Sequence, residues 1–254
     1  MKWTRWYPSG GPARQRHIIG AMPEIAVEFA SRLERLRGDL AAQGERVKQA
    51  VDRSFESFFT RSTTLAEQVA ADDDAIDKAD VELEKSAVAL LTDATRRTSH
   101  LEPEQLRAVL TVVKINNELE RVADLAADVA AMVGAISSPS EQVPATFRVM
   151  TNSVVGIVRD TVRAVDRSDA AQAKRVLQSE STITAFKDAI VRDAEQQIAS
   201  GKMSLDCAFV LHEVAGLCER IADHCTNIAE QIIYMVTGAI VRHQESGWVE
   251  VKGA

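Results

Sequence analysis

The sequence predicts an all-α protein made of two tandem antiparallel three-helix bundles that are related by internal duplication. Three observations support this fold class. Only 5% of the 254 residues are aromatic, which disfavours strand-rich packing and favours helices packed through alanine, leucine and valine. None of the six prolines interrupts the long segments in which apolar residues recur every three or four positions. A motif of the first half also recurs without a gap in the second half.

The first half is expected to contain three helices. The first runs from about Pro23 to Phe59 and carries apolar residues at spacings of three, four or seven. The second opens at Thr64, where the tetrapeptide TLAE has the form of a capping box. The third holds Pro103 in its first turn and leads to a serine- and proline-rich break at residues 137–140.

The second half repeats this count. Its first helix is expected over about residues 145–166, and the next starts at residues 168–169. Residues 200–201, a serine and a glycine, separate that helix from the last one, which ends near Gly238. Long helices joined by short turns pack antiparallel, so six helices indicate two units of three.

These breaks divide the chain into five parts. They are a flexible basic and aromatic leader (residues 1–22), a first bundle (23–137), a linker (138–144), a second bundle (145–238) and a tail (239–254). Prolines and glycines in the leader oppose regular structure there. The tail is expected to be loose.

The net charge of −7 argues against several classes of function. An acidic protein is repelled by phosphate backbones and anionic lipids, so nucleic-acid binding is not expected. The sequence also has neither an apolar secretory signal nor a stretch of about 20 apolar residues that could span a bilayer. A cytoplasmic location follows as the expectation.

Motifs of common enzymes are missing. None of the five histidines follows a glutamate by three positions, as in ferritin-like di-iron oxidases. Glycine-rich nucleotide loops, G-x-S-x-G and H-E-x-x-H are absent too, so no enzyme is expected. His224, beside Asp223, is interpreted as a polar neighbour in preference to a metal ligand. Cys207, Cys218 and Cys225 form no C-x-x-C pair and are expected to be small core residues.

The duplicated motif carries the acidic residues of greatest interest. LERVADLAADVA begins at residue 119, and CERIADHCTNIA begins at residue 218, 99 positions later. Glu120 and Asp124 thereby correspond to Glu219 and Asp223. Since four residues advance a helix by 400°, the two acids of each pair lie one turn apart on the same face and can point at one ligand.

A fainter match pairs the preceding helices. The segment of residues 73–77, DDAID, corresponds to residues 180–184, ESTIT, which lie 107 positions later. The last helix of each bundle extends its acids into a ridge of oxygen-bearing side chains: Asn117, Glu120, Asp124 and Asp128 in the first, and Glu219, Asp223, Asn227 and Glu230 in the second. Like charges four residues apart cost a few tenths of a kcal/mol each, so such ridges need solvent, a basic partner or a cation.

Three interpretations of the ridges stay open. In the first, the ridges are helix faces exposed to solvent. In the second, Arg121 and Arg220 neutralise the neighbouring acids. In the third, two ridges meet and form a metal site. Carboxylates without histidine or cysteine suit iron, manganese, magnesium or calcium, whereas zinc usually prefers some nitrogen or sulfur.

Over about residues 25–238, the chain resembles the PhoU family of phosphate-specific transport system accessory proteins. ERVADLAADVA, CERIADHCTNIAEQIIYMVTG and DDDAID carry the resemblance. It implies two three-helix bundles, E/D-x-x-x-D motifs that hold multinuclear iron or zinc clusters in some members, and repression of phosphate-starvation signalling. Family members act through a membrane sensor histidine kinase and the ATPase of the phosphate importer, which implies a place at the periphery of membrane complexes.

The resemblance also implies metal ligands. They form a first-bundle set and a second-bundle set, with two additional candidates: Asp73, Asp77, Glu120 and Asp124; Glu180, Glu219 and Asp223; and Asp128 and Asn227. Thr184 stands where the second set needs another carboxylate, so that cluster is weaker, smaller or absent. Iron or zinc is implied, with manganese or magnesium as alternatives.

The predicted function is a metal-binding helical adaptor that restrains a sensor kinase and a phosphate importer when phosphate is plentiful. One alternative is a helical accessory subunit of another transporter. Another is a structural helical protein that binds no metal and exposes its acidic ridges to water. Acidic ridges can also dock basic partner surfaces, and metal bridging between copies would favour a homodimer.

Overall fold

A computed structural model describes residues 24–97, 100–135, 143–244 and 247–251. Within these residues the all-α prediction is confirmed, and the first half forms three long helices. They are α1 (Glu24–Thr60), α2 (Thr63–Arg96) and α3 (Pro103–Ala131), and the short 3-10 helix η1 (Met132–Gly134) follows. The predicted leader and most of the predicted linker lie outside the described residues.

The second half contains four helices where three were expected. They are α4 (Ala145–Arg167), α5 (Ala170–Leu177), α6 (Glu180–Ala199) and α7 (Leu205–Thr237). The helix expected after residues 168–169 breaks at Gln178 and Ser179, where the backbone amides donate to the carbonyls three residues earlier. The Ser179 hydroxyl also donates to the Val176 carbonyl, at 2.6 Å.

Side chains cap the helix starts, although not always the predicted ones. The capping box expected at Thr64 is wrong, because the Ser62 hydroxyl caps α2 by accepting from the Leu65 amide at 3.3 Å. The predicted start at Asp169 is confirmed, since its carboxylate accepts from the first amides of α5. At its C-terminal end, α7 is terminated by Gly238 with a φ of 75°, a backbone conformation that glycine tolerates best.

The prediction of a loose tail is wrong for the residues that the structure describes. Strands β1 (Ile240–Gln244) and β2 (Gly247–Val251) form an antiparallel hairpin, in which Ile240 lies opposite Val251. Their β-branched residues explain the preference for strands. The Arg242 guanidinium binds the buried carboxylate of Glu230, the last residue of the predicted second ridge, and thereby fixes β1 to α7.

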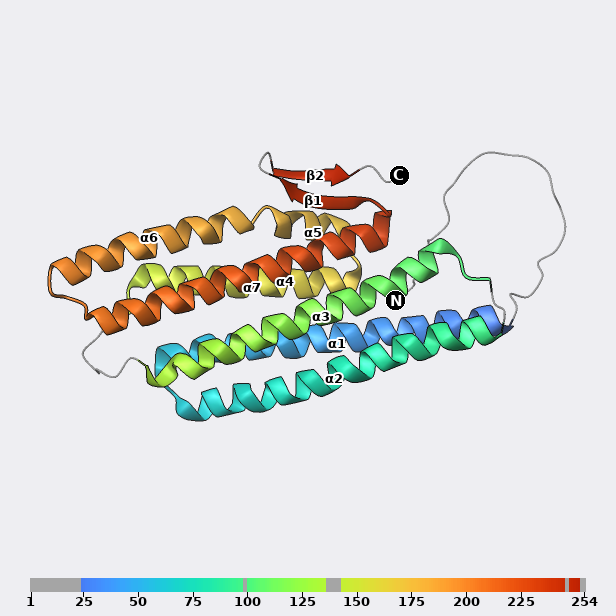
Figure 1. Ribbon diagram of the computed structural model, residues 1–254, viewed down its shortest axis with the longest axis horizontal. Helices are drawn as coiled ribbons and strands as arrows, with labels where there is room; N and C mark the ends of the chain where they lie inside the picture. Colours follow the sequence, from blue (N-terminus) through green and yellow to red (C-terminus); the bar gives the residue numbers. More distant parts are fainter. Residues whose placement is uncertain (1–23, 98–99, 136–142, 245–246, 252–254) are drawn as a thin grey trace.

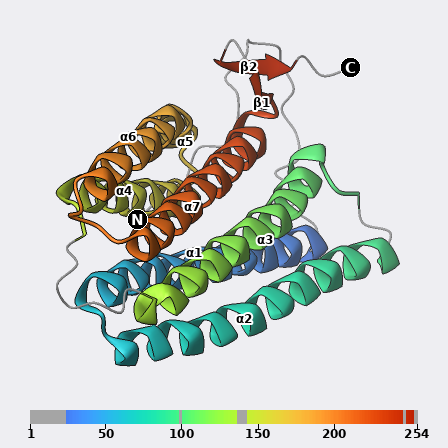
Figure 2. The same ribbon diagram turned by 60° about the vertical axis from the view of Figure 1, so that its left-hand side comes forward.

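The two bundles pack against each other through two helix pairs. In Figures 1 and 2, α3 lies beside α7, and contacts also join α1 to α4. The buried apolar residues of both halves form one continuous core. At Gly44, α1 approaches α4 so closely that an added Cβ atom would lie 3.3 Å from Val162 Cγ1.

None of the described helices is both long enough and apolar enough to cross a membrane. The expectation for the three cysteines is confirmed, since all are buried and unbridged. Burial raises the thiol pKa of Cys218 and Cys225 to about 12. These thiols therefore stay protonated at neutral pH and have little nucleophilic character.

Candidate functional site

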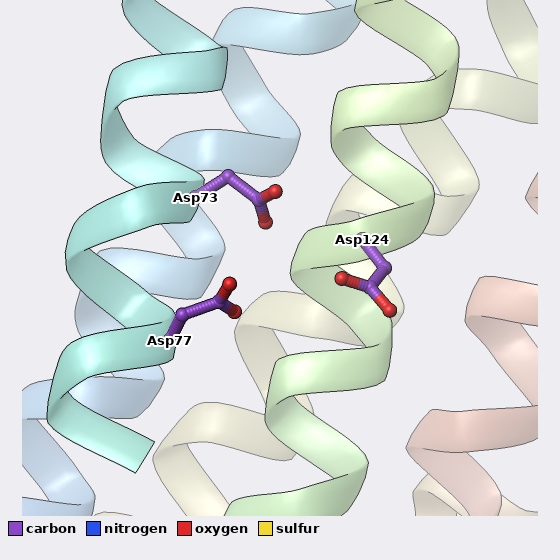
Figure 3. A group of neighbouring side chains, drawn as sticks. All are labelled: Asp73, Asp77 and Asp124. Atoms are coloured by element: carbon purple, nitrogen blue, oxygen red, sulfur yellow. The ribbon is translucent and has the colours of Figure 1, made fainter. Parts of the chain in front are cut away.

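Helices α2 and α3 bring three aspartates together. Asp73 and Asp77 project from consecutive turns of α2 toward Asp124 on α3 (Figure 3). One carboxylate oxygen of each lies within 4.8 Å of one oxygen of each of the others. We call Asp73, Asp77 and Asp124 the aspartate cluster.

Buried amide side chains hold the turn of α2 that contains Asp77, at residues 76 and 80. From α1, Gln43 Nε2 donates to the Ile76 carbonyl oxygen at 2.7 Å. From α3, Asn116 Nδ2 donates to the backbone carbonyl and the carboxylate of Asp80, at 3.1 and 2.5 Å. Both amide side chains are almost fully buried, so α2 is fixed from both sides next to the cluster.

Asp73 bears the largest electrostatic penalty. Burial raises its pKa to about 6, and repulsion from Asp77 and Asp124 adds to this increase. Its Oδ1 atom is buried and has no hydrogen-bond partner among the described residues. A buried carboxylate oxygen of this kind needs a proton or a cation.

Arg121 only partly neutralises the cluster. Its guanidinium lies 3.5 Å from Asp124 and 3.5 Å from Glu120. The pKa of Asp124 is nevertheless raised, because burial and the charge of Asp77 outweigh the arginine. Burial likewise raises the pKa of Glu120, with contributions from Asp124, Asp77 and Asp80. The interpretation that Arg121 neutralises these acids is therefore insufficient for the first bundle.

The remaining residues of the first predicted set lie around the cluster. Glu120 projects one turn before Asp124 and stays outside the group of oxygens that lie within 4.8 Å of one another. Its Oε2 atom is buried and has no hydrogen-bond partner among the described residues. Asp128, an additional candidate, is exposed but close enough to raise the pKa values of Asp73 and Asp124.

The second predicted set is arranged differently. Lys187 Nζ donates to Glu219 Oε2 at 2.5 Å, and Thr184 Oγ1 donates to Glu219 Oε1 at 3.4 Å. Asp223 is exposed on α7, and Glu180 is the first residue of α6, with a side chain outside the described part of the structure. Within the described residues, only the aspartate cluster gathers three such ligands.

Asn227, the other additional candidate, takes part in a contact between the bundles. Its Nδ2 atom donates to Glu118 Oε2 at 3.1 Å, and His224 Nδ1 lies 2.8 Å from the same oxygen. His224 is thus a polar neighbour, as interpreted from the sequence, but its partner is Glu118 on α3. Burial opposes the charged form of Glu118, yet the two hydrogen bonds outweigh it and lower the glutamate pKa.

Sequence reasoning missed several of these residues for different reasons. Asp80 and Lys187 are themselves 107 positions apart, so extending the match between α2 and α6 by one turn would have found them. The contact between Glu118 and His224 has no local signal, because it depends on how α3 packs against α7.

The aspartate cluster suits a hard cation. Its donors are carboxylates from two helices, and a cation would neutralise the charge that now raises the pKa of Asp73. Asp73, Asp77 and Asp124 would provide oxygen ligands, with Glu120 one turn away. Such an ion would connect α2 to α3 at a place where like charges otherwise repel.

Comparisons with known proteins agree with the duplicated motifs. A family model described as PhoU domain matches the chain twice, over residues 40–133 and 147–232. The phosphate-specific transport system accessory protein PhoU homolog 1 of Thermotoga maritima is 29% identical over 227 residues, which cover 87% of this chain and 96% of the relative. A PhoU homolog of Pseudomonas aeruginosa is 28% identical over 226 residues, which cover 86% and 89%.

Solved structures share the fold. The phosphate transport system regulatory protein PhoU from Streptococcus pneumoniae is similar with a TM-score of 0.76 at 20% identity, covering 84% of this chain and 99% of that one. PhoU from Pseudomonas aeruginosa has a TM-score of 0.74 at 26% identity and covers 83% and 99%. Since the two family matches together span well over half of the sequence, this chain belongs to the PhoU family.

Proposed function

We propose that this protein regulates phosphate transport and phosphate-starvation signalling as a non-enzymatic, metal-binding adaptor. It restrains a sensor histidine kinase and the ATPase of a phosphate importer when phosphate is plentiful. The relatives named as phosphate transport accessory and regulatory proteins support the pathway. The aspartate cluster, with its buried oxygen that lacks a partner, is the observation that supports a metal-dependent mechanism.

The metal site belongs to the first bundle in this proposal. Asp73, Asp77 and Asp124 hold the ion, and Glu120 joins them when a cluster of more than one ion forms. Iron or zinc is the first candidate from the family resemblance, while the all-oxygen donor set also suits manganese and magnesium. The ion supplies positive charge that joins α2 to α3 and makes the presented surface less acidic.

The first test is deletion of the gene in an organism that carries a single copy. Phosphate-starvation gene output and phosphate uptake are measured in phosphate-rich medium. Derepressed output with excess uptake, reversed by the intact gene, is the expected result. Unchanged output and uptake would contradict the regulator proposal and leave a helical accessory protein of a different system.

Complementation then tests the metal site separately. Asp73→Asn combined with Asp124→Asn preserves side-chain shape and removes two charges, so this variant should fail to restore repression. Glu67→Gln, an exposed carboxylate on the same helix α2, is the matched control and should restore it. Equal restoration by both variants would leave the regulator in place and remove the aspartate cluster from its mechanism.

A further inference from the structure

The duplication allows the two acidic faces to be compared position by position. Residues of α2 recur 107 positions later in α6, and residues of α3 recur 99 positions later in α7. The first face has six acidic residues: Asp73, Asp77, Asp80, Glu120, Asp124 and Asp128. Their counterparts are Glu180, Thr184, Lys187, Glu219, Asp223 and Asn227. The formal charge changes from −6, for six carboxylates, to −2, for three carboxylates and one ammonium group.

Two of the positions that differ between the faces, Thr184 and Lys187, lie next to Glu219. Glu219 receives a hydrogen bond on each carboxylate oxygen, from Lys187 at 2.5 Å and from Thr184 at 3.4 Å. The Lys187 and Glu219 side chains are each only 28% exposed, so solvent screens this ion pair less than a typical surface pair. The carboxylate of Glu219 is therefore neutralised from within the protein.

The counterpart in the first bundle faces acids at the same two positions. Asp77 and Asp80 stand in the first bundle at the positions that Thr184 and Lys187 take in the second. The Oε2 atom of Glu120 is buried without a hydrogen-bond partner among the described residues, and its ion pair with the Arg121 guanidinium is long, at 3.5 Å. The same backbone positions thus place donors around one glutamate and further carboxylates around the other.

We infer that the second-bundle face takes no metal ion, because the Lys187 ammonium occupies the role that a cation plays in the first bundle. A metal ion bound at Glu219 would have to break the ion pair with Lys187 and then lie beside the displaced positive charge. Lys187, helped by Thr184, thereby decides which half of the duplicated fold responds to metal. The contrast between the two halves depends on the proposed metal role of the first bundle. The exclusion of metal from the second-bundle face by Lys187 does not depend on it.

The test asks whether the exclusion can be reversed. All variants are made in the full-length chain, and the aspartate cluster is first disabled with Asp73→Asn and Asp124→Asn. On that background, Thr184→Asp and Lys187→Asp restore the acidic residues of the first face. This switch variant is titrated with Mn²⁺ by calorimetry, and circular dichroism checks that it folds.

A matched control receives the same change in charge nearby. Thr182→Asp and Lys174→Asp alter an exposed threonine and an exposed lysine on α6 and α5. The switch variant should bind one Mn²⁺ at least about tenfold more tightly than this control does, because carboxylate number sets affinity for hard cations. The disabled background itself should bind none at this face.

Two results would overturn the inference. One is Mn²⁺ binding by the disabled background that is lost on Glu219→Gln, since this would place metal beside an intact Lys187. The other is a folded switch variant that binds no more tightly than the control. If the starting protein binds no Mn²⁺, the proposed metal role fails. The switch variant still decides whether Lys187 keeps metal from the second-bundle face.

A single substitution covers the case in which the switch variant does not fold. Lys187→Met keeps the apolar stem and removes the ammonium from Glu219. On the disabled background, Mn²⁺ should raise the melting temperature of this variant and leave that of the parent unchanged. Identical responses of the two proteins would contradict the inference.

Discussion

The two bundles carry the same glutamate-arginine pair at equivalent positions, 120–121 on α3 and 219–220 on α7, yet the two glutamates meet opposite surroundings. Burial and neighbouring carboxylates raise the pKa of Glu120 against the effect of Arg121, whereas both oxygens of Glu219 receive hydrogen bonds. The difference comes from residues on the neighbouring helix, above all Asp80 in α2 and Lys187 in α6. Equivalent positions of a duplicated fold can therefore hold acids in one half and an internal ion pair in the other.

The largest expected effect is stabilisation of the first bundle by metal. At a free Mn²⁺ concentration about 100 times the Kd, binding should stabilise the fold by about 2.7 kcal/mol. For a chain of this size, the melting temperature should rise by roughly 5–10 °C. Asp73→Asn with Asp124→Asn should abolish most of this rise, as measured by calorimetric melting.

Controls locate that effect in one half. Glu219→Gln in the second bundle should leave the Mn²⁺-dependent rise intact, and so should Glu67→Gln on the exposed face of α2. An undiminished rise in the double aspartate variant would show that the stabilising ion binds elsewhere.

The next effect is a difference in sign between the stability changes that follow from removing the charge of Glu120 and from disturbing that of Glu219. In chelator at pH 7, Glu120→Gln should stabilise the protein by about 0.5–1 kcal/mol, because it removes a charge from a repulsive group. Lys187→Met should destabilise it by about 1–2 kcal/mol, since Glu219 would lose its cation in a partly shielded place. Glu219→Gln should destabilise it by less.

Urea unfolding of the three variants measures these changes. Matched slopes against urea concentration would show that the same surface unfolds in each case. If Glu120→Gln and Glu219→Gln shift stability in the same direction, the contrast between the two faces does not hold.

The pH dependence of the apo protein should be smaller but diagnostic. With a folded-state pKa of about 6 against a usual value of 3.8, Asp73 holds a proton that the unfolded chain releases between those values. Stability should therefore fall as pH rises from about 4 to about 6. Since Asp73 is only partly buried, the loss should be on the order of 1 kcal/mol after solvent screening.

Asp73→Asn should flatten this part of the stability profile, measured by chemical unfolding in chelator. Added Mn²⁺ should reverse the trend, because a metal ion competes with the proton and binds more tightly as pH rises. A profile of the starting protein that is already flat between pH 4 and 6 would mean that the cluster relieves its charge in another way.

Much of the fold follows from the sequence because its signals are local. Apolar periodicity and the positions of prolines predict the long helices, with ends such as Gly238 close to those observed. The break at Ser179 and the hairpin beyond Gly238 were not predicted. The break lies where the amides of Gln178 and Ser179 donate to carbonyls three residues earlier, and no proline or glycine marks it in the sequence; the hairpin is tied to the bundle by the contact between Arg242 and Glu230.

The aspartate cluster was predicted partly from spacing. Acids four residues apart on a helix must share a face, so pairing Asp73 with Asp77 needs no tertiary knowledge. Bringing Asp124 to them depends on the packing of α2 against α3, which the family resemblance supplied. The role of Lys187 was not predicted, because a lysine does not belong to a pattern of carboxylate ligands and its contact with Glu219 depends on how α6 packs against α7.

The smallest expected effect concerns the contact shared by both bundles. Glu118 on α3 accepts from His224 and Asn227 on α7, and the 99-residue match gives Leu217 and Leu125, both buried, as the counterparts of Glu118 and His224. Because these bonds lower the folded-state pKa of Glu118, they contribute stability above its usual value of 4.5, and this contribution is lost as pH falls through the lowered pKa.

Glu118→Gln should therefore cost about 0.5–1 kcal/mol at pH 7 and progressively less in acid, as measured by urea unfolding across pH. Replacing both Glu118 and His224 by leucine, the residue of the matching positions, should recover part of that loss, since only the amide of Asn227 then loses its partner and this exposed side chain can bond to water. A double leucine variant less stable than either single variant would instead show that the polar contact, and not apolar packing, joins α3 to α7 at this point.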